Sequence, residues 1–184
     1  MSGHLFIILG ASGAGKDSLI RALCRSSMSL QSARRVITRP HHAESEDFES
    51  VSIEVFKNLA QQNAFLFSWQ AHGLFYGIRR DILDVLAAGE HVIVNGSRGA
   101  LSDMKKQYPD LHAIFIAVDP NILEERLRIR GREDEAQIAD RIKRATIAAP
   151  EETYVISNNT TIEKAVCELE GLIGSIINGQ KEYV

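Results

Sequence analysis

Short apolar runs alternate with helical stretches along most of the chain. Residues 5–9 form a continuous apolar run that ends at Gly10, a pattern typical of a strand buried on both faces of a parallel sheet. Comparable runs predict further strands over residues 31–37, 91–94, 111–118 and 154–157. Strands that alternate with helices in this order predict an α/β fold of three layers with a mostly parallel sheet, and ligands of such folds bind at the carboxyl ends of the strands.

Apolar positions spaced three and four residues apart predict the helices. Leu19 and Leu23 share one face of a helix expected over residues 15–25. The closing segment, 162–176, repeats this spacing, which predicts a helix packed on the sheet. Similar patterns predict helices over residues 52–62, 81–88, 120–130 and 134–148.

The middle of the chain is less regular, with a polar stretch, a helical pattern and a short apolar run. This irregularity predicts a small lobe inserted into a single domain. We expect the lobe to span residues 38–78, the core to span 1–37 and 79–184, and a helical lid to span 126–144.

Composition narrows the class of protein. The chain has 184 residues, 45% of them hydrophobic, which is enough for one compact core. A formal charge of −3 argues against a general nucleic-acid or membrane partner, and the first apolar run is too short for a signal peptide. Cys24 and Cys167 suit neither a disulfide scaffold nor a zinc site, so we expect a cytoplasmic protein. The sequence leaves a homodimer open.

A glycine-rich motif follows the first predicted strand. Its pattern is glycine, four residues, then glycine and lysine, between a buried strand and a helix, which is the context of the phosphate loop of P-loop NTPases. Backbone N–H groups of such a loop surround a diphosphate, and Lys16 is predicted to reach the terminal phosphates. The predicted nucleotide-binding residues are Gly10, Ala11, Ser12, Gly13, Ala14, Gly15, Lys16, Asp17 and Ser18.

Asp17 departs from this motif, which normally carries a serine or threonine that holds Mg²⁺. A carboxylate can bind the metal directly or through water. Alternatively, Asp17 is an acidic residue that the helix dipole favours in the first turn. Both interpretations stay open at this point.

A basic segment lies in the last third of the chain. Residues 126–144 carry a net charge of +3 in a protein of −3. Arginines on two helices joined at Gly131 can close over a nucleotide and neutralise charge on a transferring phosphoryl group. The alternative is a solvated helix face with internal charge pairs.

A second basic cluster consists of Arg34, Arg35 and Arg39, on and just after a predicted strand and close to where an acceptor should lie. Arg39 is the best placed of the three. Tyr76, beside Gly77, is predicted to donate a hydrogen bond to an acceptor phosphate, although a packed loop tyrosine fits the same pattern.

These motifs resemble those of the guanylate-kinase-like group of phosphate-loop kinases, and the resemblance covers nearly the whole chain. The matching segments are 10–18, 37–40, 75–77, 126–127, 130–131 and Arg141. The resemblance implies that Arg39 and Tyr76 hold the acceptor phosphate. It also implies that lid arginines contact the donor phosphates and act in catalysis with Lys16; these arginines are Arg126, Arg130 and Arg141.

Departures from the guanylate kinases themselves argue against guanine recognition. The second arginine of their acceptor motif is replaced around His41 and His42, Gln70 stands for the guanine-reading glutamate, and Asn95 stands for an aspartate. Segments 15–18, 68–77, 94–98 and 130–133 instead resemble the ribose 1,5-bisphosphate phosphokinases of phosphonate degradation, and Asp17 is part of that match.

This resemblance implies transfer of the γ-phosphoryl group of ATP, with Mg²⁺, to the 1-phosphate of ribose 1,5-bisphosphate, which gives 5-phosphoribosyl 1-diphosphate and ADP. A phosphate acceptor is already anionic at neutral pH and needs no strong general base. The candidates for contacts to the sugar bisphosphate, besides Arg39 and Tyr76, are Gln70, His72, Asn95, Ser97 and Arg98.

Three rival functions remain. A guanylate kinase would convert GMP to GDP. A catalytically silent guanylate-kinase-like module would bind protein partners and usually has a degraded phosphate loop. A kinase that acts on a sugar hydroxyl would need a positioned base near the phosphate loop, because a hydroxyl proton must leave.

Overall fold

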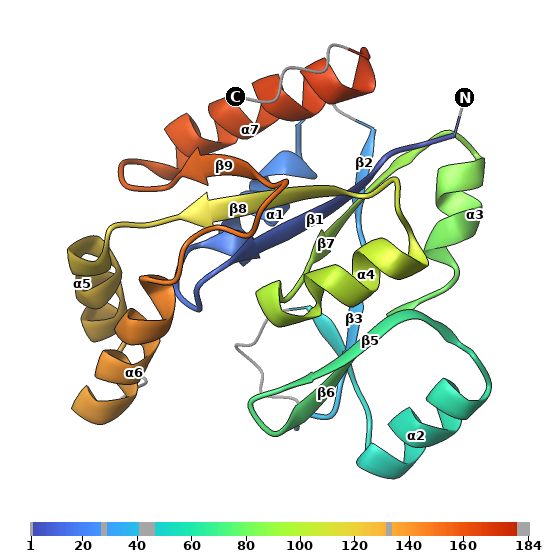
Figure 1. Ribbon diagram of the computed structural model, residues 1–184, viewed down its shortest axis with the longest axis horizontal. Coiled ribbons are helices and arrows are strands. Elements are labelled where there is room, and N and C mark those ends of the chain that lie inside the picture. Colours follow the sequence, from blue (N-terminus) through green and yellow to red (C-terminus); the bar gives the residue numbers. More distant parts are fainter. Residues whose placement is uncertain (1, 27–28, 41–46, 132–133, 180–184) are drawn as a thin grey trace.

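A five-stranded parallel sheet forms the centre of the protein (Figure 1), in the order β2, β7, β1, β8, β9. The structure is a computed structural model that describes residues 2–26, 29–40, 47–131 and 134–179, without the side chains of Arg130 and Arg144. The strands of this sheet are β1 (Leu5–Gly10), β2 (Leu30–Ser32), β7 (His91–Asn95), β8 (His112–Ala117) and β9 (Tyr154–Ser157). The predicted α/β fold with a parallel sheet is confirmed.

Helices cover both faces of the central sheet. They are α1 (Lys16–Leu23) and α7 (Ile162–Ile177) on one face, and α3 (Ile82–Ala87) and α4 (Leu101–Gln107), which follows a 3₁₀ turn at Arg98–Ala100, on the other. None of the described helices is long and apolar enough to cross a membrane.

The middle strand β1 is buried on both faces, as its apolar run predicts. Leu5, Ile7 and Leu9 pack on the side of α3 and α4, whereas Phe6 and Ile8 pack on the side of α1 and α7. All five side chains are fully buried. Each contributes about 1.5–3 kcal/mol to the stability of the fold, so β1 is a rigid base for the loop at its carboxyl end.

A second, four-stranded sheet stands beside the core. Its order is β4 (Phe48–Ser50), β3 (Arg35–Ile37), β6 (Leu74–Arg79), β5 (Phe65–Ala71). Helix α2 (Ile53–Gln61) begins at Ser52, whose side chain caps it, and packs Phe56 against Phe65 with ring centroids 4.7 Å apart. Arg79 on β6 reaches across β3 to Glu49 on β4, with 2.6 Å between the charged groups.

The predicted strand over residues 31–37 is wrong, because the structure divides it between the two sheets. β2 pairs with β7 in the core, and Ala33 donates the last hydrogen bond to that sheet, to the carbonyl of Ile93 at 2.9 Å. β3 then pairs with β4 and β6. The polar residues between Leu30 and Val36 interrupt the apolar pattern where the chain leaves the core.

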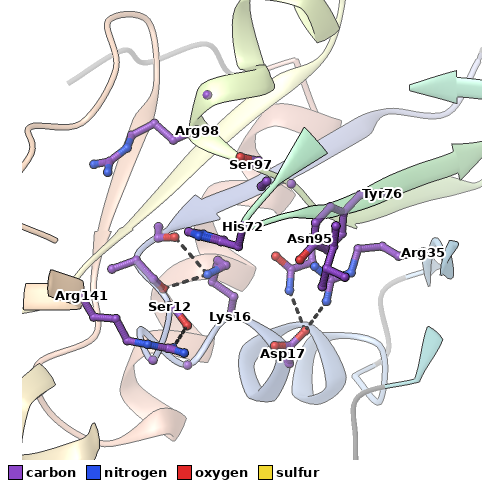
Figure 2. Close-up of a pocket in the computed structure, with 18 of the residues that line it drawn as sticks. Ser12, Lys16, Asp17, Arg35, His72, Tyr76, Asn95, Ser97, Arg98 and Arg141 are labelled. Atoms are coloured by element: carbon purple, nitrogen blue, oxygen red, sulfur yellow. Dashed lines mark hydrogen bonds and ion pairs between the residues drawn. The ribbon is translucent and has the colours of Figure 1, made fainter. Parts of the chain in front are cut away.

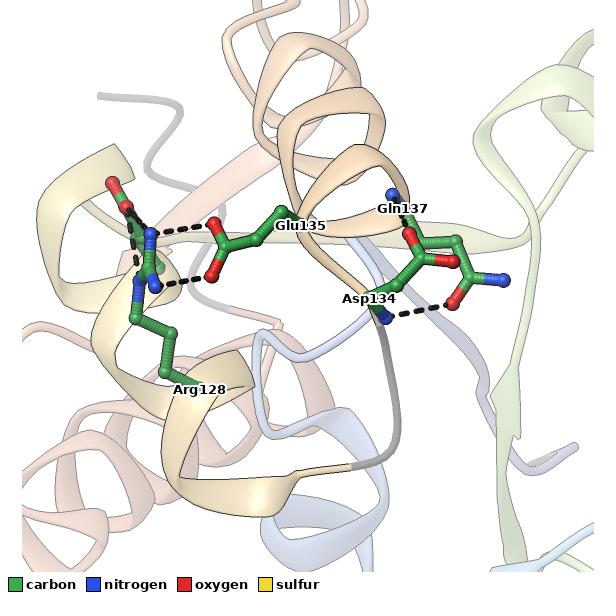
Figure 3. Close-up of polar contacts among 5 residues, drawn as sticks. Arg128, Asp134, Glu135 and Gln137 are labelled. Carbon is green, nitrogen blue, oxygen red and sulfur yellow. Dashed lines mark hydrogen bonds and ion pairs between the residues drawn. The ribbon is translucent and has the colours of Figure 1, made fainter.

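Two helices occupy the segment predicted as a lid (Figure 1). They are α5 (Pro120–Arg130), with the predicted bounds, and α6 (Glu135–Ala145), three residues shorter at its end than the pattern predicts. Arg128 joins them, because its guanidinium donates to Glu124 on its own helix at 2.9 Å and to Glu135 on α6 at 2.5 and 2.8 Å (Figure 3). Asp134 and Gln137 form a reciprocal cap at the start of α6.

Three histidines meet at the amino-terminal edge of the central sheet. The backbone N–H of His4 donates to Nδ1 of His91, and Nδ1 of His4 lies 3.0 Å from Nε2 of His112. Burial lowers the pKa of His91, and the neighbouring His4 lowers it further. Protonation of this ring therefore works against the folded state.

We expect acidification to destabilise the fold partly through His91. Its pKa in the unfolded chain, about 6.5, lies above its folded value, so the unfolded chain binds more protons as the pH falls below about 6.5. His91→Asn keeps an acceptor for the His4 N–H but cannot titrate. In urea denaturation at pH 7.5 and 5.5, the wild type should lose more unfolding free energy than this variant. Equal losses would contradict the assignment.

Candidate active site

A cleft of about 620 Å³ opens at the carboxyl ends of β1 and β7. The phosphate loop forms its floor, the second sheet forms one wall, and residues of α5 and α6 contribute to the other. Figure 2 shows side chains from these separate parts of the chain converging around Lys16. Ligands of α/β folds bind at this edge of the sheet, as the sequence predicts.

The loop after β1 needs glycine at two positions. Gly13 and Gly15 have φ angles of 91° and 86°, in the left-handed region that disfavours other residues. A Cβ on Gly15 would also lie 2.7 Å from Nδ2 of Asn158. Asn158, which is 1% exposed, donates that Nδ2 hydrogen to the carbonyl of Ala14 at 2.8 Å, so it supports the loop from below.

Lys16 extends back over the loop from the first residue of α1. Its ammonium donates to the carbonyl oxygens of Gly10 at 3.0 Å and Ala11 at 2.8 Å. Arg141 on α6 donates to the hydroxyl of Ser12, which links α6 to the loop (Figure 2). Two cations and the amino end of α1 therefore face the same part of the cleft, an arrangement that suits a polyphosphate.

Asp17 forms a bridge between three elements of the site. Its Oδ1 accepts a hydrogen bond of 2.6 Å from Nδ2 of Asn95 at the end of β7, and it lies 3.6 Å from a guanidinium nitrogen of Arg35 on β3 (Figure 2). Asn95 is 7% exposed, and among the described residues its Oδ1 has no hydrogen-bond partner. A buried acceptor of this kind is costly unless a ligand donates to it.

The wall formed by the second sheet carries aromatic and cationic groups. Trp69 stacks on Tyr76 with ring centroids 5.4 Å apart, and the guanidinium of Arg39 lies 5.6 Å from the ring centre of Phe48. His72 is the first residue of the two-residue turn between β5 and β6, where its φ of 53° matches the hairpin geometry that needs positive φ.

Most residues predicted for the site come together in this cleft. Those that line it are Gly10, Ala11, Ser12, Gly13, Gly15, Lys16, Asp17, Ser18, Arg39, His72, Tyr76, Asn95, Ser97, Arg98, Arg126 and Arg141. Ala14 is fully buried and does not line the cleft. The side chain of Arg130 lies outside the described part of the chain, and so do His41 and His42.

Gln70 lies beside the main cleft. Side chains alternate along β5, so Trp69 and Ala71 line the cleft, whereas Gln70 is exposed and lines a smaller adjoining cavity of about 300 Å³. It is therefore not among the residues that line the main cleft.

Three side chains at the site are absent from the predicted set. Arg35 and Trp69 line the cleft from neighbouring strands, and Asn158 supports the loop from below. Asn158 directly follows the predicted strand 154–157, and a polar residue at the carboxyl end of a predicted parallel strand is the signal that marks it. No sequence signal separates Arg35 from the adjacent Arg34.

Comparisons with known proteins agree with this geometry. The guanylate kinase family profile matches residues 2–176. Ribose 1,5-bisphosphate phosphokinase PhnN of Pseudomonas paraeruginosa (strain DSM 24068 / PA7) is 41% identical over 180 residues, which are 95% of this chain and 97% of that protein. The protein of the same name from Klebsiella pneumoniae subsp. pneumoniae is 39% identical, with 95% of each chain covered.

A solved structure shares the fold. The crystal structure of guanylate kinase from Anaplasma phagocytophilum superposes with a TM-score of 0.69 at 19% identity, covering 95% of this chain and 86% of that one. The family profile spans almost the entire chain, and the relatives match over nearly their full length. The chain therefore belongs to the guanylate kinase family.

Proposed function

We propose that this protein is a ribose 1,5-bisphosphate phosphokinase. The observation that carries the proposal is a cleft with a phosphate loop on its floor and cationic side chains around it, in a chain about 40% identical to relatives of that name. An oxygen of the 1-phosphate attacks the γ-phosphorus of ATP, the bond from that phosphorus to the bridging oxygen breaks, and ADP leaves with the electron pair. The products are 5-phosphoribosyl 1-diphosphate and ADP.

On the donor side, the phosphate loop and Lys16 hold the terminal phosphates of ATP. Arg126 and Arg141 line the cleft from α5 and α6 and neutralise charge on the transferring group. The contact of Arg141 with Ser12 supports this role because it already joins the lid to the loop. We assign the same donor-side role to Arg130.

On the acceptor side, we propose that the second sheet is the acceptor-binding lobe. Arg39 and Tyr76 bind the 1-phosphate, which places its oxygen opposite Lys16. The unpartnered Oδ1 of Asn95 accepts a hydrogen bond from a pentose hydroxyl. Contacts to the 5-phosphate are assigned to His72, Ser97 and Arg98, which line the cleft as well.

The chemistry requires positioning and charge neutralisation more than proton transfer. A phosphate monoester loses its second proton near pH 6, so the acceptor oxygen is already anionic at neutral pH. Among the described residues that line the cleft, Asp17 is the only carboxylate, and Arg35 and Asn95 engage it. Asp17 is therefore poorly placed to serve as the base that a sugar-hydroxyl acceptor would need.

We also propose that Mg²⁺ accompanies ATP. The hydroxyl of Ser18 and the carboxylate of Asp17 line the cleft beside the phosphate loop and are oxygen groups of the kind that Mg²⁺ binds. When bound, the ion neutralises charge on the donor phosphates. We place the protein in the cytoplasm, where ATP is available and free thiols such as Cys24 and Cys167 persist.

Guanylate kinase is the second candidate, because the family and the structural neighbour carry that name. Gln70 stands where the guanine-reading residue is expected but lines the adjoining cavity, which argues against guanine recognition. A protein-binding module without catalysis is disfavoured by the intact loop and the cations around it.

The substrate is tested by ADP release with Mg-ATP and either ribose 1,5-bisphosphate or GMP, with the product identified by ³¹P NMR. We expect turnover with the sugar bisphosphate and a diphosphate signal from 5-phosphoribosyl 1-diphosphate. Turnover with GMP alone would establish a guanylate kinase instead.

Lys16→Ala should reduce turnover by at least about 10³-fold, because it removes the cation that meets the transferring phosphoryl group. The variant should keep the melting temperature of the wild type within a few degrees, because the Lys16 ammonium lies at the cleft, where it donates to the carbonyls of Gly10 and Ala11. Activity near that of the wild type would exclude the phosphate loop from the mechanism.

Arg39→Ala should raise the KM for ribose 1,5-bisphosphate by about 10- to 100-fold, the loss expected when a charged hydrogen-bond partner is removed. The KM for ATP should change by less than about threefold. Initial-rate kinetics with each substrate varied separately measure both constants. The opposite ranking would mean that the acceptor site lies elsewhere.

A further inference from the structure

We propose that Arg35 is a second phosphate-binding cation of the acceptor site, and that the Asp17 carboxylate positions its guanidinium. Arg35 would bind the phosphate that receives the transferred group, together with Arg39. The proposal rests on the proposed function for the identity of the acceptor. It does not depend on which phosphorylated acceptor the protein uses.

The register of the second sheet turns Arg35 toward the cleft. Ile37 on β3 lies directly opposite Tyr76 on β6, and Trp69 on β5 lies opposite Tyr76 on its other side. Residues directly opposite in antiparallel strands share a face, and so do residues two apart in one strand. Arg35 therefore stands on the same face as Tyr76 and Trp69, which line the cleft.

Burial makes this guanidinium unusual among surface arginines. The Arg35 side chain is 12% exposed, whereas that of the adjacent Arg34 is 57% exposed. A charge withdrawn from water to this extent is costly unless fixed partners surround it. Asp17, 3.6 Å away, supplies one opposite charge. A guanidinium has five N–H donors in a planar fork, so it can hold a carboxylate and a phosphate at once.

The Asp17 carboxylate is itself fixed in a position from which it can orient Arg35. It stands in the first turn of α1, next to Lys16, and its Oδ1 also accepts the short hydrogen bond from the buried Asn95. The ion pair thus ties β3 of the second sheet to the helix that carries the donor-binding lysine. Arg35 is fixed at the boundary between the donor and acceptor sides of the cleft, where the two phosphates must meet.

The charges of the substrates explain why Arg35 and Asp17 occur as a pair. The acceptor phosphate carries nearly two negative charges at neutral pH and must approach the terminal phosphate of ATP. Arg39 neutralises one of them, and the Arg35–Asp17 pair adds no net charge, so Arg35 contributes through its directed N–H contacts to the phosphate. An unpaired carboxylate at position 17 would add further repulsion, but paired with Arg35 it leaves the pair neutral before the acceptor binds.

The test is equilibrium binding of ribose 1,5-bisphosphate by calorimetry without ATP and with EDTA, so that metal binding by Asp17 plays no part. We expect Arg35→Met to raise Kd by about 10- to 100-fold. Asp17→Asn, which keeps an acceptor for Asn95, should raise Kd by about 3- to 10-fold. The double variant should bind no more weakly than Arg35→Met, because Asp17 acts through Arg35.

Arg34→Met is the matched control. Arg34 is the neighbouring arginine, pairs with Asp47 at 2.9 Å and does not line the cleft. Its Kd should stay within about twofold of the wild-type value. In kinetics, Arg35→Met should raise the KM for the acceptor and leave the KM for ATP within about twofold of the wild-type value.

Several outcomes would overturn the inference. If Arg35→Met and Arg34→Met bind ribose 1,5-bisphosphate with equal Kd, Arg35 does not bind the acceptor. Additive losses in the double variant, or a normal Kd for Asp17→Asn, remove the positioning role. If Arg35→Met does not fold, Arg35→Lys replaces it and must still weaken binding, because lysine cannot keep the planar contacts.

Failure of the proposed function is separable from failure of this inference. If the wild type binds and phosphorylates GMP but not the sugar bisphosphate, the substrate is wrong, and the same variants are measured with GMP. The same pattern of losses would then uphold Arg35 as a phosphate ligand. Binding of neither acceptor to the wild type would overturn both proposals.

Discussion

The proposed reaction brings two phosphorylated substrates together, and the repulsion between them is the constraint on which the arrangement of the cleft depends. A triphosphate and a phosphate acceptor approach within bonding distance only where fixed positive groups offset their charge and water is excluded. The protein places positive groups at one edge of its central sheet: the amino end of α1, Lys16, Arg35 and Arg39 from the second sheet, and Arg141, which donates to Ser12 of the loop. Rigidity comes from β1, which is fully buried beneath that edge.

The two sheets contribute different parts of the cleft. The parallel sheet presents the loop that suits a nucleotide polyphosphate, and the smaller sheet presents a wall of aromatic and cationic side chains. Asp17 and Asn95 join them, through one carboxylate oxygen that contacts both Asn95 and Arg35. Asp17, at a position that usually carries a metal-binding hydroxyl, thus links α1 to the second sheet.

The sequence pattern predicts those parts of the fold that depend on residues close together in the chain. The loop after β1, the burial of β1 and the closing helix α7 each follow from a few neighbouring residues. The division of 31–37 between two sheets does not, because it depends on pairing with distant strands. Register decides the site in the same way: one step along β5 separates Trp69, in the cleft, from Gln70, outside it. Arg34 and Arg35 are neighbouring arginines that the sequence pattern does not distinguish. In the structure only Arg35 lines the cleft.

The most direct test of this account is a crystal structure of the protein with a non-hydrolysable ATP analogue, Mg²⁺ and ribose 1,5-bisphosphate. The account predicts the terminal phosphate of the analogue at Lys16 and the 1-phosphate of the sugar between Arg39 and Tyr76, with an oxygen in line for attack. A sugar bisphosphate seated in the smaller cavity beside Gln70, or with its 1-phosphate turned away from Lys16, would contradict it.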